Sequence, residues 1–204
     1  MILSDLTLQL LAFRLAAGLL VFTVQGAAIA AMAVALGDAG PRHDGRLSGW
    51  PAPHIDMLGL GAILLTGFGW ARPVAIEADA LRGGRWGLVG AVVASSAVLL
   101  LLGVLLLQLA IPLLTVLPPT PGLVAVAFVR TAARICVWIA LFSLLPLPPL
   151  AGAHFLAALG VGVPRQAGPV VGLVLFAASL FGVTRMVLKP VYDVVAPVVL
   201  GGAA

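Results

Sequence analysis

The sequence predicts an all-α integral membrane protein with about five hydrophobic segments. Hydrophobic residues make up 62% of the chain and charged residues only 9%, whereas about a quarter of the residues in a soluble domain are charged. The mean hydropathy of +1.21 agrees with this class. Charge-free runs near or above the roughly 20 residues that span a bilayer recur along the chain. We therefore expect a single polytopic membrane domain over residues 1–204.

The first two segments differ in length. A helix is expected over 7–36, because 23 uncharged residues separate Arg14 from Asp38. A cleavable signal peptide is the alternative, since Ala-Ile-Ala follows the apolar run, but Asp5 precedes the run and Arg14 alone supplies a positive flank. The second segment, 57–71, has only 15 uncharged residues, so we expect a tilted, re-entrant or one-sided helix.

The remaining segments follow two longer runs and the end of the chain. The 44 uncharged residues after Arg85 divide at the PPTPG stretch, where prolines cannot continue a helix, which predicts helices over 86–111 and 123–145. A last helix is expected over 167–188, with Arg185 and Lys189 near its end. The apolar tail 190–204 is too short to span and is expected in the membrane interface or against another protein.

Charged residues and cysteine exclude several roles. Basic residues outnumber acidic ones, 11 to 7, but they are scattered, which favours lipid headgroups and topology signals over nucleic acid as their partners. Arg130 and Arg134 share a helix face and are expected to reach the headgroups; pairing with a partner subunit is the alternative. Cys136 is the only cysteine, so no internal disulfide forms.

Two polar or irregular features interrupt the apolar sequence. Gln25 places one amide in an apolar run, and an unpaired amide costs about 2–7 kcal/mol in apolar surroundings. Further along, Pro146, Pro148 and Pro149 break any helix. Broken backbone is tolerated in a membrane only where it is buried in protein or lines a polar cavity. The break therefore either kinks a packed span or shapes a site.

The stretch LLPLPPLAG, 144–152, resembles the LLPxPPLDGG element of the site-2 protease family, the intramembrane zinc metalloproteases, in its short bacterial branch without a PDZ domain. Three further elements follow the family order: Gly37 with Asp38, then GRLSGWPAPHIDMLG (45–59), then FGWARPV (68–74). The resemblance implies a site-2-protease-like helical core in a bacterial inner membrane. It also implies that Asp38, Arg46, His54, Asp56 and Trp70 pin the connecting loops.

The chain departs from the family at the positions of the chemistry. The family places HExxH 12 residues before the glycine that matches Gly37, so its first histidine falls at Gln25, its glutamate at Gly26 and its second histidine at Ile29. The aspartate of PPLDGG falls at Ala151. A catalytic zinc needs three protein ligands and an open position for water, and the general base must be a proton acceptor. We expect no zinc, no other cofactor and no peptidase activity.

The same comparison assigns two more positions. The substrate-orienting asparagine corresponds to Ala97, and the asparagine before LLPxPP to Ser143. The remaining metal-ligand candidates are His43, His54, Asp56 and His154, which lie in different loops, so a rearranged metal site is not favoured. We expect a packing site or vestigial pocket, in which the Gln25 amide bonds to the broken backbone; its candidate residues are Gln25, Ser143, Pro146, Pro148, Pro149 and His154.

The favoured function is that of a proteolytically inactive, site-2-protease-like membrane protein that binds transmembrane segments as an accessory or structural subunit, an assembly factor or a regulator. The expected partners are other integral membrane proteins and the lipid bilayer. The alternative is a hydrolase with a rearranged or partner-completed site. A small transporter or channel has less support, because charges are nearly absent from the spans and no paired half-helices appear.

Overall fold

The computed structural model describes residues 6–162, 164 and 166–201. Within these residues the regular elements are helices, and the only extended pairing is an isolated antiparallel bridge between Ile55 and Ala71. Three stretches are long and apolar enough to cross a membrane: Leu8–Leu36, Arg85–Val116 and Pro119–Ser143. A bent helix pair over 167–200 raises the number to four. The expected all-α membrane fold class is confirmed.

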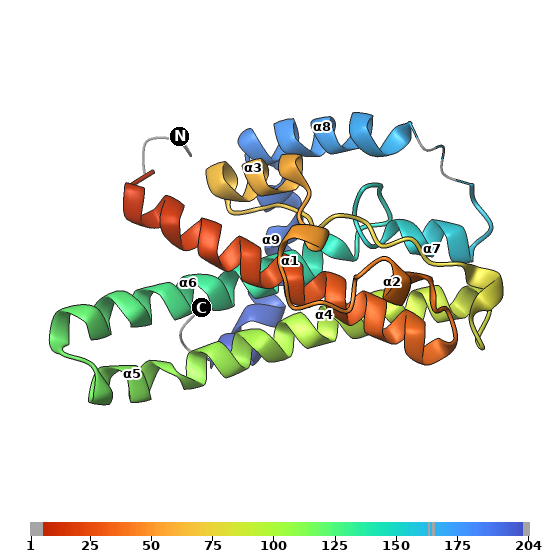
Figure 1. The fold of residues 1–204 in the computed structure, drawn as a ribbon. Coiled ribbons are helices and arrows are strands. Elements are labelled where there is room, and N and C mark those ends of the chain that lie inside the picture. The colour runs from red at the N-terminus through yellow and green to blue at the C-terminus, as the bar shows by residue number, and fades with distance from the viewer. Residues whose placement is uncertain (1–5, 163, 165, 202–204) are drawn as a thin grey trace.

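Helix α1, Leu8–Leu36, passes through the centre of the molecule (Figure 1). The Thr7 side chain accepts a hydrogen bond from the Leu10 N–H and so caps its first turn. Gly37, with φ of 120°, ends it, because only glycine adopts this angle easily. The short helix α2, Gly40–His43, and the 3-10 turn η1, Ala52–His54, lie in the connection that follows.

Helix α3 is shorter than the expected 57–71 segment and covers Met57–Thr66. Asp56 caps its start by accepting from the Gly59 N–H at 2.8 Å, and Gly67 ends it with φ of 82°. A helix of ten residues is about 15 Å long, half of the roughly 30 Å hydrocarbon core. It does not span alone, and the chain beyond Gly67 continues as an extended segment.

Helices α4 and α6 form a long antiparallel pair beside α1 (Figure 1). The turn η2, Ala78–Ala80, leads into α4, Arg85–Gln108, which is followed by α5, Ala110–Val116, so the span reaches beyond the expected end at residue 111. Helix α6 covers Pro119–Ser143 rather than 123–145. Its early start was missed because Pro119 and Pro121 lie in the first turn, where proline N–H groups are not needed.

The last helix was predicted wrongly as 167–188 followed by a tail. Helix α8, Ala167–Leu180, is separated from α9, Val183–Leu200, by a bend of 76°. Gly182 has φ of 76°, which lets the chain turn there. Arg185 and Lys189 therefore lie inside α9 rather than near the end of a span, and Lys189 pairs with Asp193 at 2.5 Å on its exposed side.

The expected interfacial tail is part of the packed fold. Ala196 and Leu200 of α9 are almost fully buried against residues of α1, α4 and α6, including Ala17, Leu99 and Cys136. Trp138 of α6 stacks on Tyr192 of α9, with ring centroids 3.8 Å apart. Small residues at the contacts let these helices approach closely, as in membrane bundles generally.

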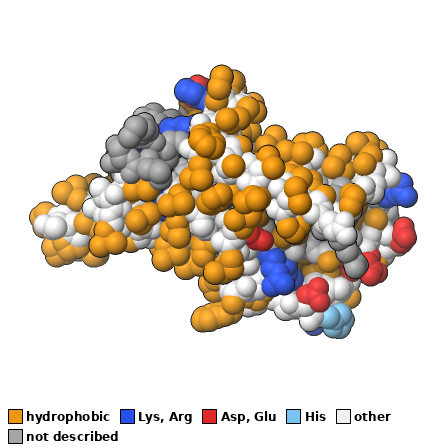
Figure 2. Space-filling model, turned by 90° about the horizontal axis from the view of Figure 1, so that it is seen from above, with side chains coloured by type: hydrophobic (Ala, Val, Ile, Leu, Met, Phe, Trp, Pro, Cys, Tyr) orange, Lys and Arg blue, Asp and Glu red, His pale blue; other side chains and the backbone are white. Residues whose placement is uncertain are grey.

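The surface agrees with a lipid environment. Hydrophobic side chains cover most of the face in Figure 2, and charged ones gather mainly toward the end that carries α2. On α4 only a small share of the span is buried inside the protein, and Val93, Leu101 and Leu105 are exposed. Exposed apolar residues at this density require an apolar solvent or a partner.

Candidate functional site

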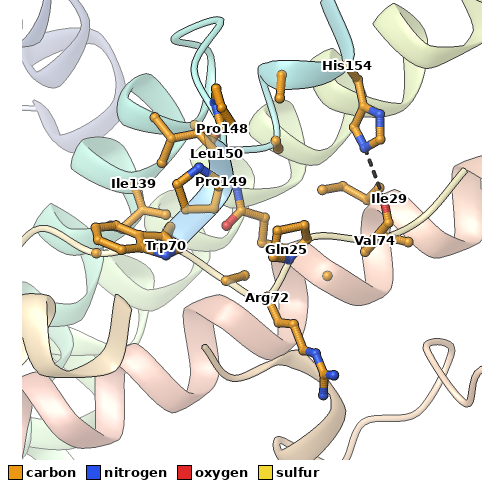
Figure 3. Close-up of a pocket in the computed structure, with 18 of the residues that line it drawn as sticks. Gln25, Ile29, Trp70, Arg72, Val74, Ile139, Pro148, Pro149, Leu150 and His154 are labelled. Atoms are coloured by element: carbon orange, nitrogen blue, oxygen red, sulfur yellow. Dashed lines mark hydrogen bonds between the residues drawn. The ribbon is translucent and has the colours of Figure 1, made fainter. Parts of the chain in front are cut away.

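A cavity of about 210 Å³ lies where α1 meets two irregular segments. The wall from α1 consists of Gln25, Gly26 and Ile29. The extended segment 69–74 forms a second wall, and the proline-broken segment 148–151 forms a third, with His154 of α7, Ala153–Ala158, beside it (Figure 3). Residues far apart in the sequence thus converge on one space.

The broken segment keeps its shape through local hydrogen bonds. The Gly152 N–H donates to the Ser143 carbonyl at 2.7 Å, which closes a loop over the three prolines. The Leu150 N–H donates to the Leu147 carbonyl at 2.8 Å. The Ser143 hydroxyl donates to the Ala140 carbonyl at 2.9 Å and lies 3.3 Å from the Ser96 hydroxyl. The break therefore satisfies much of its own backbone and does not depend on Gln25.

Gln25 is buried, with 2% of its surface exposed, and lines the cavity. Its side chain extends from α1 toward the broken segment in Figure 3. The expected hydrogen bond to that segment is not formed: the Gln25 amide has no hydrogen-bond partner among the described residues. Because the segment bonds to itself, the amide is left facing the cavity with two donors and one acceptor available.

Gly26 is in close contact with the loop histidine. The His54 side chain is fully buried, and a Cβ atom added to Gly26 would lie only 2.3 Å from its Nδ1. The His54 Nε2 lies 2.9 Å from the Ser48 carbonyl, which only accepts, so Nε2 carries the hydrogen. Burial lowers the pKa of His54 and favours the neutral ring. The imidazole thus occupies the space into which any side chain at position 26 would project.

Trp70, which was expected to pin a loop, lines the cavity. Its indole is 3% exposed, and its Nε1 is buried without a partner among the described residues. The segment that carries it crosses α3 at Gly59, where an added Cβ would lie 2.1 Å from the Trp70 carbonyl oxygen. A glycine is required there to bring the indole against the cavity.

Three other loop residues hold the wall that Trp70 belongs to. The Asp38 carboxylate accepts from the Gly40 and Glu77 N–H groups, both at 2.9 Å. The Arg46 guanidinium donates to the carbonyls of Arg72 at 3.3 Å and Pro73 at 2.7 Å. Asp38 thus ties residue 77 to the end of α1, Arg46 ties residues 72–73 to the connection before α3, and Asp56 caps α3.

The structure places most, but not all, of the other predicted residues at the cavity. Ser143, Pro148, Pro149, Ala151 and His154 line it, whereas Pro146 is exposed and does not. Ala97 also lies away from it, on the exposed side of α4. Its neighbour Ser96 is buried and donates a hydrogen bond to α6. Successive residues of a helix point about 100° apart, so when Ser96 faces α6 the next residue, Ala97, faces the exterior.

Sequence reasoning missed several lining residues. They come from the extended segment, the buried side of α6, the broken segment, the first residue of α7, the connection before α8 and the start of α8. In chain order they are Gly69, Ala71, Arg72, Pro73, Val74, Ile139, Leu150, Ala153, Pro164 and Gly168. In the sequence analysis FGWARPV was expected only to pin a loop through Trp70. Its irregular Gly-x-Ala-x-Pro composition was the available indication of non-helical backbone near a site.

The residues of the cavity do not fit a zinc ion. Among the described residues there is no group of three or more His, Cys, Asp or Glu side chains that could hold a metal. His154 is the only described lining residue with an imidazole, and its Nε2 donates to the Val74 carbonyl at 3.1 Å. That leaves the His154 Nδ1 and the neutral amide of Gln25, which are too few ligands for a catalytic zinc site.

Comparison with known proteins gives one informative match. The chain is 34% identical over 144 residues to a protein of Bacillus subtilis (strain 168) described as "Putative zinc metalloprotease YwhC", with 64% of this chain and 61% of that protein aligned. No family model and no solved structure matches the chain. The chain spans less than two thirds of the relative's length. The similarity supports a site-2-protease-like relationship.

Proposed function

We propose that this chain is a proteolytically inactive, site-2-protease-like protein of a bacterial inner membrane that binds transmembrane segments of other membrane proteins. Such a protein serves as an accessory or structural subunit, an assembly factor or a regulator. The proposal draws on the similarity to a protein named as a zinc metalloprotease and on the composition of the cavity described above.

The observation that carries the proposal is the convergence of four positions on one cavity. Gln25, Gly26, Ile29 and Ala151 stand where the family pattern has two histidines, a glutamate and an aspartate, and all four line the same space. Between them they supply one neutral amide and no imidazole or carboxylate. Metal-dependent hydrolysis needs three ligands and a base at these positions. The four positions still share one cavity, but their side chains no longer provide metal ligands or a general base.

The contact between Gly26 and His54 supports loss of the general base. A glutamate side chain at position 26 would begin with a Cβ atom 2.3 Å from the His54 ring, well inside van der Waals contact. The ring would have to leave a fully buried position and give up its bond to Ser48. The packing around α1 is thus matched to a glycine.

Binding is favoured over simple loss of function by what surrounds the changed positions. Arg46, Asp38 and Asp56 still hold the loops that form the cavity walls. The cavity is lined mainly by apolar groups with few polar ones, which is the usual character of a binding site. A protein with this site and an apolar exterior can hold a membrane-embedded client without cutting it.

Metal content tests the proposal. Purified wild-type protein is expected to contain no stoichiometric zinc. The triple variant Gln25→His, Ile29→His, Ala151→Asp restores three ligands around the cavity and is expected to bind one zinc per chain. The matched control carries Ala97→Asp instead of Ala151→Asp; since Ala97 is exposed outside the cavity, it should bind zinc more weakly. Stoichiometric zinc with peptidase activity in the wild type would favour the rearranged or partner-completed hydrolase.

A further inference from the structure

We infer that Arg14, Arg134 and Arg185 together form a binding site for the headgroup phosphate of an anionic phospholipid. None of the three lines the cavity described above, so the inference does not depend on the proposed function. The arginines belong to α1, α6 and α9. A headgroup bound between them would hold these three helices together at one surface of the membrane.

Tyr192 of α9 lies where the three arginines meet. Its ring stacks on Trp138 of α6 with centroids 3.8 Å apart, and Arg134 lies one helical turn before Trp138. The charges of Arg134 and Arg185 both act on Tyr192. Arg185 is also close enough to Arg14 for the two positive charges to repel each other. Basic residues that are far apart in the sequence are thus neighbours in the fold.

Arg14 is the fixed member of the group. Its guanidinium donates to the carbonyls of Leu64 and Leu65, at 2.9 and 2.8 Å, in the last turn of α3. The negative end of a helix dipole stabilises a cation in this position, and a guanidinium keeps its proton in proteins. The side chains of Arg134 and Arg185 are exposed, so a ligand reaches them from the surface.

The group lies near the membrane surface opposite to the start of α4. Trp86 at that start is 71% exposed, and exposed tryptophans are typical of membrane interfaces. Gly103 lies against α6, where an added Cβ would be 3.3 Å from the Ala133 carbonyl oxygen. From Trp86 to Gly103 the helix rises about 26 Å, close to the roughly 30 Å of the hydrocarbon core. Arg134, next to Ala133, therefore reaches the headgroups on the far side.

Acidic side chains do not balance these charges within the described part of the chain. Asp193 pairs with Lys189 on α9. The other acidic side chains of the described residues lie between 38 and 79, at the opposite end of α1 and in the connections around α3. An anion bound between the arginines would relieve their mutual repulsion and form charge-assisted hydrogen bonds.

The apolar surroundings favour a lipid over a free anion. On α9, Phe181, Met186 and Val187 flank Arg185 and are 85%, 78% and 61% exposed. The acyl chains of a phospholipid would cover these side chains, whereas free phosphate would not. Guanidinium groups match phosphate oxygens geometrically, and basic pockets between membrane helices bind anionic headgroups. A zwitterionic headgroup carries its own cation, which the arginines would repel, so we expect a lipid with net negative charge.

Titration with two lipids tests the inference. The whole chain, freed of lipid in mild detergent, is mixed with phosphatidylglycerol or phosphatidylcholine of identical acyl chains, and native mass spectrometry measures the bound lipid. Phosphatidylglycerol should bind more tightly. Arg134→Gln and Arg185→Gln should each weaken its binding about fivefold, and Arg185→Lys, which keeps the charge, should weaken it less. Arg42→Gln, exposed in α2, is the matched control and should change nothing.

Thermal unfolding with and without lipid separates lost binding from lost folding. Phosphatidylglycerol should raise the unfolding midpoint of the wild type and of Arg42→Gln more than that of either glutamine variant. Equal binding of the two lipids, or full binding by both glutamine variants, would overturn the inference. Release of bound phosphatidylglycerol by millimolar inorganic phosphate would overturn it in favour of free phosphate, whereas retention supports a lipid site. An acidic membrane protein lost from Arg185→Gln, without lipid discrimination, would overturn it in favour of a partner subunit.

Discussion

Replacing Gly26 by alanine should destabilise the protein, although alanine is the better helix former. The added Cβ would lie 2.3 Å from the His54 Nδ1 and 3.1 Å from its Cγ, so the ring must move. Overpacking of this kind costs about 1–3 kcal/mol, and loss of the 2.9 Å bond from His54 to the Ser48 carbonyl adds about 1 kcal/mol. Subtracting about 1 kcal/mol for helix propensity leaves a net loss of about 1–3 kcal/mol.

Thermal unfolding in detergent micelles measures this loss. At about 2–4 °C per kcal/mol for a chain of this size, the midpoint should fall by several degrees. Gly90→Ala is the matched control, because Gly90 also lies within a long helix and nothing is within 4 Å of its added Cβ. That variant should be neutral or slightly stabilised.

A double-mutant cycle identifies the partner. In the His54→Ala background the space beside position 26 is empty, so adding Gly26→Ala should cost little or stabilise the helix. The expected coupling is about 1–3 kcal/mol. The reasoning would be refuted if Gly26→Ala were as stable as Gly90→Ala, or if its effect were the same with and without His54.

Three further outcomes follow from the contacts that hold the site. Asp38→Ala removes the acceptor of two N–H bonds and should cost about 2–4 kcal/mol, with faster proteolysis of the two connections on either side of α3, 37–56 and 67–84; unchanged cleavage would count against it. Arg14→Leu removes the guanidinium that donates to two carbonyls at the end of α3 at 2.8 and 2.9 Å and should lower stability by about 1–3 kcal/mol, while Arg42→Leu should not. Burial lowers the pKa of His54 from 6.5, so as the pH falls the unfolded chain binds a proton before the folded protein does. The contribution of His54 to stability should therefore be complete above pH 6.5 and decline below it. The decline of stability should be less steep in His54→Gln.

The spans were predictable from the sequence because membrane insertion depends on uncharged length, which can be counted directly. Helix ends were less predictable, since they depend on where each proline falls. Pro119 and Pro121 begin α6 instead of preventing it, and the bend near Gly182 occurs without a proline between α8 and α9. The burial of the last helix could not be predicted, because its uncharged run is too short to indicate a span. Its contacts with α1, α4 and α6 depend on the fold.

The site was predictable in position but not in its interactions. The resemblance to the family motifs singled out Gln25, Ile29 and Ala151 together, and all three line one cavity. Ala97 lies outside the cavity on the exposed side of α4, because α4 packs on α6 through the neighbouring Ser96, and that packing cannot be seen in the sequence of α4 alone. The Trp70 nitrogen and the contact between Gly26 and His54 depend on distances between segments, which no single-chain pattern contains.

The central claim is that this cavity holds a membrane-embedded client. A photoreactive amino acid introduced at Ile29, which lines the cavity, tests it most directly in native membranes, with position 93 on the exposed side of α4 as the control. After illumination, mass spectrometry should identify adducts between position 29 and a spanning segment of another integral membrane protein, absent from position 93. Adducts with lipid alone, or no adducts above the control, would contradict the claim.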